Sequence, residues 1–430
     1  MGFKLFDQIE ISTEDGIVGV VAAEPLDVTL VVEAQEAMDE MNAIVKDFDH
    51  ARDSLALADT VTANLEQQIA VETAIMAKPE SVTSSTVVLS MESLHATAAL
   101  IGAESLVAMI STEAIEGNPV SSLEISIEEK GALIKKIVES IKLIFKKFVT
   151  MLKSLYVKAV VAMTGIAKQA KSLKAMLDEN KANGKDVVLD DKMAAAVKGK
   201  LGAAIVKLGG NKFDTTFANK YIAELKDSAQ LAEFGKVPTS MKDLIDTVAG
   251  KDKIKAEELV TDTATAGKSD TVISYSGMGV KTLVANVPVE KDKEYTGLEG
   301  AKVLTRVTFS VKSTPVEDKE FTLKDIKYSD LGMIANQITV PAEKAKDYLT
   351  EVEKATADVE KAIEDIAKTE DDKYIAAVKF GNVMVSNIAL DKVLGYVNGL
   401  KNLMGVVSAV AKVALAKDDK PADDKKEEAK

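Results

Sequence analysis

Apolar residues recur at three- and four-residue steps along most of this chain, the spacing that places them on one face of a helix. In residues 26–76 the pattern runs without glycine or proline, and a second helix is expected from about Met91 to Ile110. Residues 186–260 repeat the pattern as helices joined by loops. The chain is therefore predicted to be mainly α-helical.

The strongest amphipathic pattern lies in residues 126–177, where we expect one long helix that would break, if anywhere, near Gly165. Its apolar stripe consists of Leu133, Ile134, Ile137, Ile141, Ile144, Phe145, Phe148, Leu152 and Leu155. Lysines occupy the other face: Lys135, Lys136, Lys142, Lys146, Lys147, Lys153 and Lys158. Between residues 130 and 174 there are eleven lysines and one acid, so this helix is strongly basic.

The pattern changes between residues 270 and 340, where four β-rich runs are separated by turn residues. These runs predict a small antiparallel sheet. A charged helix with Pro341 near its start should follow, and then an apolar helical region to residue 416. Residues 417–430 mix charges without core residues, so we expect a disordered tail.

Charge divides the chain near residue 124. Residues 1–124 hold 22 acids and 4 bases, which leaves 46 of the 68 acids and 50 of the 54 bases for the remainder. We interpret residues 1–124 as an acidic helical leader and a propeptide. The predicted regions beyond it are a Lys-rich helical region at 125–260, the β-rich region at 270–340, C-terminal helices at 341–416 and the tail at 417–430.

The composition excludes most kinds of active site. The 430 residues contain no cysteine, which removes disulfides, thiolate nucleophiles and cysteine-bound metals. The two histidines are His50 and His95, and no motif supplies a nucleophile with its base. We therefore expect a protein that is not an enzyme and that has no cofactor or metal. Arginine occurs only at Arg52 and Arg306, which argues against sequence-specific reading of bases.

A short motif, Ser-x-Glu, occurs five times and always before residue 129. The copies begin at Ser12, Ser90, Ser111, Ser122 and Ser126. A protease that reads a small residue two positions before a glutamate would recognise them. Residues 116–122 (EGNPVSS) are predicted to form a loop, and two of the copies flank it. Because proteolysis needs an accessible, extended backbone, this region is the expected place of cleavage.

Three interpretations of the lysine face remain open. It can be the solvated side of a helix in a bundle, it can bind phosphates without sequence preference, or it can lie on an anionic membrane surface. The acidic leader fits the second and third interpretations, because its negative charge would mask the lysines until it is removed.

With these features together, residues 1–175 resemble the internal head proteins of large tailed bacteriophages, of the T4-like and giant phiKZ-like kinds. The resemblance rests on the acidic leader, on small-x-Glu sites such as Ser111-Thr112-Glu113-Ala114, and on the Lys-rich run from Lys135 to Lys158. It implies a virion protein that is synthesised in the host cytoplasm, packed into the prohead and trimmed by the prohead protease.

The resemblance also implies where the protein is cut and what it meets. Recognition positions would be Ser90, Glu92, Ser111, Glu113, Ser122 and Glu124, and mature chains would start at Ala114 or Ile125. The partners would be the prohead protease, other head or inner-core proteins and packaged DNA. Two alternatives stay open: a membrane-active helical protein that uses residues 130–174 and 385–416, and an unprocessed helical scaffold that self-associates.

Overall fold

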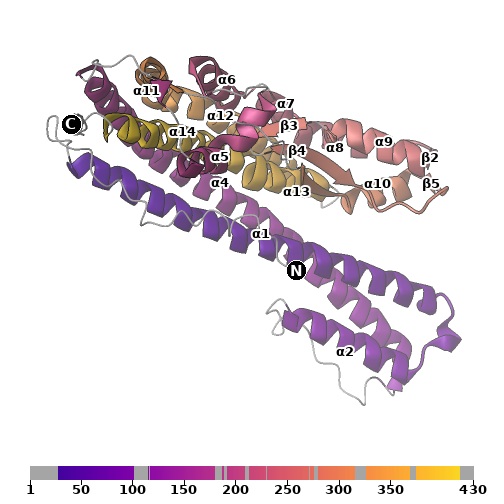
Figure 1. Cartoon of the computed structure of the whole chain (residues 1–430). Coiled ribbons are helices and arrows are strands. Elements are labelled where there is room, and N and C mark those ends of the chain that lie inside the picture. The colour runs from indigo at the N-terminus through magenta and orange to yellow at the C-terminus, as the bar shows by residue number, and fades with distance from the viewer. Residues whose placement is uncertain are drawn as a thin grey trace, which may run out of the picture.

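The protein is mainly helical and carries a small antiparallel sheet, as the apolar spacing predicts (Figure 1). In this computed structural model the described residues are 28–100, 115, 117–179, 186–187, 191–208, 213–228, 230–270, 272–275, 279–314, 326–368 and 374–416. The tail at 417–430 lies outside them, so its disorder stays a prediction.

Two long antiparallel helices frame the molecule. α1 (Val28–Met76) lies along α4 (Pro119–Glu179), with Glu40 beside Lys158 and Glu72 beside Lys130. The buried positions of α1 alternate three- and four-residue steps over much of their length: Ala34, Ala37, Met41, Phe48, Ala51, Leu55 and Ala58. This spacing allows two helices to pack knobs-into-holes over a long distance.

The chain turns back at one end of this helix pair. The short 3-10 helix η1 (Pro79–Ser81) leads into α2 (Ser84–Leu100), which packs on the beginning of α4 (Figure 1). We call this end, formed by the end of α1, α2 and the beginning of α4, the tip. The remaining elements gather around the other half of α4, and we call them the body.

Eight helices of the body surround its centre: α5 (Asp191–Lys207), α6 (Thr215–Leu225), α7 (Leu231–Gly235), α8 (Val237–Ala249), α9 (Ala256–Ala266), α10 (Gly297–Thr305), α11 (Tyr328–Glu343) and α12 (Ala345–Ala367). Local chemistry fixes several of their starts. The Asp214 side chain accepts a 2.8 Å hydrogen bond from Phe217 N at the start of α6. Thr296 and Glu299 form a reciprocal capping box at the start of α10.

The sheet is small and antiparallel. β3 (Val272–Tyr275), β4 (Gly279–Asn286) and β6 (Thr308–Thr314) pair in the order β3-β4-β6. Two separate ribbons pair β1 (Asp186–Val187) with β7 (Ile326–Lys327), and β2 (Lys253–Lys255) with β5 (Glu294–Thr296).

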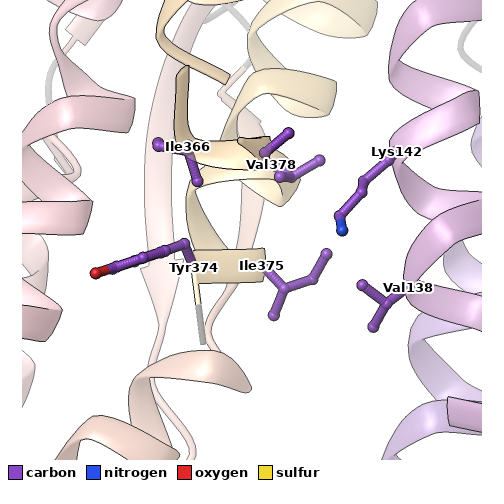
Figure 2. Close-up of a pocket in the computed structure, with 7 residues that line it drawn as sticks. Val138, Lys142, Ile366, Tyr374, Ile375 and Val378 are labelled. Carbon is purple, nitrogen blue, oxygen red and sulfur yellow. The ribbon is translucent and has the colours of Figure 1, made fainter. Parts of the chain in front are cut away.

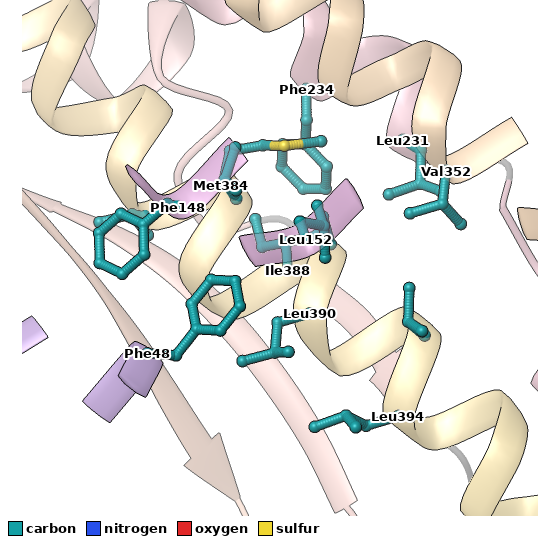
Figure 3. Close-up of a cluster of buried hydrophobic side chains, with 14 of the residues drawn as sticks. Phe48, Phe148, Leu152, Leu231, Phe234, Val352, Met384, Ile388, Leu390 and Leu394 are labelled. Atoms are coloured by element: carbon teal, nitrogen blue, oxygen red, sulfur yellow. The ribbon is translucent and has the colours of Figure 1, made fainter. Parts of the chain in front are cut away.

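The centre of the body is one continuous helical segment. It comprises α13 (Ile375–Val383), the π-helical turn η5 (Met384–Ala389) and α14 (Leu390–Ala416). From Tyr374 to Val397 every residue is buried except the half-buried Asn387. Figure 3 shows how side chains of this segment, such as Met384 and Ile388, meet Phe48 of α1 and Phe148 of α4. The segment therefore packs on helices from the N-terminal half of the chain.

Two helices, Pro119–Glu179 and Ile375–Lys412, are long and apolar enough to cross a membrane by length and composition. The body buries 67% of the most apolar window in the second helix and 50% in the first. Because these apolar residues line the protein core, core packing accounts for both patterns. The 385–416 segment, which the membrane alternative needs on the surface, is mostly buried in its described part.

The structure corrects several predicted boundaries. The predicted loop at 116–122 is wrong from residue 119 onward, because α4 begins at Pro119. Asn118 caps this helix: its Oδ1 accepts a hydrogen bond from Ser121 N at 3.2 Å. No break occurs at Gly165, which is buried inside α4. Packing on both sides of it outweighs the roughly 1 kcal/mol cost of a helical glycine.

The β-rich region is also smaller than predicted. Residues 270–340 include all of α10 and most of α11, and Pro341 lies inside the last turn of α11 rather than at the start of the next helix. A single residue, Lys344, separates the end of α11 from the start of α12 at Ala345. Pro341 has no N–H to bond the carbonyl of Gln337 four residues before it, so it weakens the last turn of a helix that ends two residues later.

Candidate processing sites and lysine face

The candidate cleavage tripeptides occupy three different settings. Ser90-Met91-Glu92 lies inside α2, with Ser90 buried and Glu92 exposed. Ser122-Leu123-Glu124 lies in the first turns of α4, with Ser122 buried and Glu124 exposed. The positions Ser111, Glu113 and Ala114 lie outside the described residues, between the end of α2 and the beginning of α4. Two of the three sites are therefore helical in the folded chain.

The buried serines of these tripeptides belong to a polar cluster inside the tip. Lys130 of α4 is 0% exposed, and its Nζ lies 2.5 Å from Oε1 of Glu72 on α1 and 2.8 Å from Oγ of Ser90 on α2. The Oγ atoms of Ser90 and Ser126 lie 2.6 Å apart. We call Glu72, Ser90, Ser126 and Lys130 the tip cluster.

Burial governs the electrostatics of this cluster. It lowers the pKa of Lys130, while the hydrogen bond and the charge of Glu72 act in the opposite direction. The ammonium group also donates to the Ser90 carbonyl oxygen at 3.3 Å. All three helices of the tip thus supply an oxygen to one buried cation. Lys130 was not among the predicted site residues, although its position continues the apolar stripe that passes through Leu133 and Ile137.

Ile125, the candidate first residue of a mature chain, is 41% exposed in α4. It lies one residue before the buried Ser126, so a cut after Glu124 would fall within the helical turns that carry the tip cluster. Such a cut would require those turns to unwind.

The predicted lysine face exists on α4 and most of it is open to solvent. Lys135, Lys136, Lys146, Lys147 and Lys153 are exposed, whereas Lys142 and Lys158 are partly buried. Three of the seven side chains form ion pairs: Lys142 with Glu139 at 2.6 Å, Lys153 with Glu360 at 3.1 Å, and Lys158 with Glu40. Within the described ranges, the other four have no ion-pair partner.

This arrangement limits how the leader can mask the lysines. In the described part of the chain, one of the seven lysines contacts an acid of the leader: Lys158 pairs with Glu40 of α1. The exposed lysines already face solvent while α1 is docked. Within the described ranges, α1 and α2 leave these lysines uncovered, so masking by this part of the leader would act through its net negative charge.

Charged contacts join α1 to the rest of the protein along its length. Besides Glu40 and Glu72, Asp59 lies 2.9 Å from Lys379 of α13, and Glu66 pairs with Arg306 at the end of α10. The Arg52 guanidinium donates to the carbonyl oxygen of Ser386 in the π-helical turn. Both arginines of the chain therefore connect α1 to the body. This seam of contacts holds the acidic leader helix in place.

Aromatic packing strengthens the same seam. Phe48 of α1 is 0% exposed, and its ring stacks on Phe148 of α4 with the centroids 5.3 Å apart and the planes 12° apart (Figure 3). Burial of two aromatic side chains against each other is a large apolar contribution. The leader helix is thus part of the hydrophobic core and not a loosely attached segment.

A pocket between α4, α12 and α13 does not fit a ligand site. Its enclosed volume is only about 10 Å³, and it is lined by Val138, Lys142, Ile366, Ala367, Tyr374, Ile375 and Val378 (Figure 2). This volume holds about one water molecule and is far below the size of small-molecule sites. Its one charged side chain, Lys142, is paired with Glu139. Within the described residues, no group of three or more His, Asp or Glu side chains is placed to hold a metal ion.

Comparison with models of known protein families identifies a family for this chain. The model of the family described as phiKZ-like phage internal head proteins matches residues 21–418. No curated protein and no solved structure matches the chain. The family match extends well beyond residues 1–175 and includes the whole body.

Proposed function

Because the chain belongs to the phiKZ-like phage internal head proteins, we propose that it is made as a precursor whose acidic leader is cleaved after a Ser-x-Glu site. Membership in this family places the protein inside the phage capsid, after synthesis in the host cytoplasm, as a structural protein of the virion that associates with other head components. Cleavage and the contacts of the mature chain are the parts that we propose.

Two sequence features support cleavage: all Ser-x-Glu tripeptides lie within the first 128 residues, and the net charge of the chain changes near residue 124. A protease binds its substrate as extended chain, and the sites at Glu92 and Glu124 lie in helices, so a cut at either site requires local unwinding. Cleavage after Glu113, which lies outside the described residues, would give a mature chain that starts at Ala114.

We propose that the lysine face contacts packaged DNA through its phosphates. Lys135, Lys136, Lys146 and Lys147 are exposed on one helix and separated by three helical turns, so both pairs point the same way. Point charges on flexible stems bind phosphate without reading sequence, which suits a protein packed against arbitrary DNA. The prohead protease is the partner that cleavage requires.

The test of cleavage is the N-terminal residue of the protein in purified virions, measured by intact mass and terminal peptide mapping. A start at Ala114 supports cleavage after Glu113, and a start at Ile125 supports cleavage after Glu124 with unwinding of the first turns of α4. A full-length chain in mature virions would contradict the proposal and favour an unprocessed scaffold.

A further inference from the structure

The tip cluster places a buried cation where three helices meet. Lys130 comes from α4, Glu72 from α1 and Ser90 from α2, and each supplies or receives a hydrogen bond within 2.8 Å. A buried ammonium group is tolerated only when nearby oxygens replace its water shell. Separation of any one helix would remove one of these oxygens, so the cluster favours a tip in which all three helices stay together.

Apolar packing around the cluster gives it no other way to be solvated. Val87, Leu94 and Ala98 of α2, Leu123 of α4 and Leu65 of α1 are all 0% exposed. Opening the tip therefore has to expose apolar side chains and hydrate the lysine at the same time. This makes the closed tip a cooperative unit that opens as a whole.

The cluster is built from the residues that the protease motif contains. Ser90 begins the tripeptide that ends at Glu92, Ser126 begins the one that ends at Glu128, and Glu72 ends the related Ala70-Val71-Glu72. Ser122, at the start of the remaining helical tripeptide, is 3% exposed and lies one turn before Ser126. The serines of these tripeptides are thus turned into the tip, whereas Glu92 and Glu124 are exposed.

We propose that the tip cluster is a lock that keeps the helical Ser-x-Glu tripeptides at Ser90–Glu92 and Ser122–Glu124 closed to proteolysis while the tip is intact. The two helical sites become substrates only after the tip opens. The lock rests on the proposed function in one respect, since it delays two of the cuts of that same maturation.

The experiment uses the full-length protein and a commercial Glu-specific endoproteinase, which needs a glutamate in a stretch of chain that can unwind into an extended form. The variant Lys130→Met keeps the length and apolar stem of the side chain but leaves the Glu72 carboxylate buried without its cation. We expect cleavage after Glu92 and Glu124 to become about a hundredfold faster, because removal of one partner of a buried ion pair strongly destabilises the structure around it. Peptide mapping by mass spectrometry over time gives the rate at each bond.

Two further variants separate the lock from a general loss of stability. The double variant Lys130→Met, Glu72→Leu removes both charges, and we expect it to restore slow cleavage at both sites. Ser90→Ala removes one hydrogen bond and serves if Lys130→Met does not fold; a smaller acceleration, about tenfold, is expected. Lys147→Met, at an exposed position of the same helix, is the matched control and should leave all rates unchanged.

The outcomes are distinct. Faster cleavage confined to the tip, and its reversal in the double variant, supports the lock. Unchanged rates at Glu92 and Glu124 in both Lys130→Met and Ser90→Ala overturn it, as does an equal acceleration after Glu353 in α12, which would indicate general unfolding. Because the endoproteinase replaces the phage enzyme, the result does not depend on whether virions contain a processed chain.

Discussion

The stacked pair Phe48 and Phe148 offers a direct test of how firmly the leader helix is held. Phe48→Ala removes a ring that is 0% exposed and that joins α1 to α4 and the π-helical turn. Phenylalanine-to-alanine changes in cores cost about 3–5 kcal/mol, because apolar burial is lost and a cavity remains. The chain has no tryptophan, so fluorescence is a poor probe of this change.

Hydrogen–deuterium exchange of peptides from α1 is the suitable measurement. If α1 opens separately from the body, about 3–5 kcal/mol corresponds to exchange that is roughly 150- to 5,000-fold faster in residues 40–60. Leu57→Ala is the matched control, since Leu57 is on the same helix and 42% exposed, and it should change exchange by less than about threefold. Exchange in α1 that stays within twofold of the parent in Phe48→Ala would refute the docked leader helix.

Three other predictions concern the lysine face, close packing and pH. The double variant Lys146→Gln, Lys147→Gln should lower the salt slope of log DNA affinity by about two, measured by filter binding from 50 to 200 mM salt. The control variant Lys220→Gln, Lys226→Gln, at α6 and its C-cap, should leave the slope unchanged. Equal slopes in all proteins would remove α4 from the interface with DNA. Gly381→Ala should destabilise the protein by about 1–3 kcal/mol in urea unfolding, although alanine is the better helix former. The reason is that the new Cβ atom would clash with Ile363 Cδ1 on the neighbouring helix α12. A stabilised variant would show that the two helices are less closely packed. Burial raises the pKa of the hydroxyl groups of Tyr156, Tyr221, Tyr348 and Tyr396. The stability that these groups contribute is therefore complete below about pH 10 and is lost as pH rises further. An ultraviolet titration in which all eight tyrosines ionise together near pH 10, before the circular dichroism changes, would contradict this.

The long helices were predictable because their apolar periods are long and uninterrupted. α1 covers nearly the whole of the predicted 26–76 segment, and α4 includes all of 126–177. The start of α4 was misplaced because Gly117, Asn118 and Pro119 were taken together as turn residues. An Asn at the N-cap followed by Pro at the first helical position is equally a helix-start signal, and the structure uses it that way.

Other features depend on contacts that spacing alone does not reveal. The predicted β-rich region extended to residue 340 and so included most of α11, although Leu331, Ile334, Ala335 and Ile338 follow the helical period and are 0% exposed. The tip cluster was not visible because Glu72 and Lys130 are 58 residues apart in the chain. A lysine and two serines on the buried stripe of a helix were its sequence signal.

The position of the central helical segment has a consequence for how the chain acquires its structure during translation. Residues 375–411 are made after α4, α5, α6, α8, α11 and α12, yet all six of these helices pack on them. Until the ribosome has released this segment, the apolar faces made earlier lack their common neighbour. The body therefore cannot complete its core before residue 411 has emerged, although N-terminal parts of many large proteins fold during synthesis.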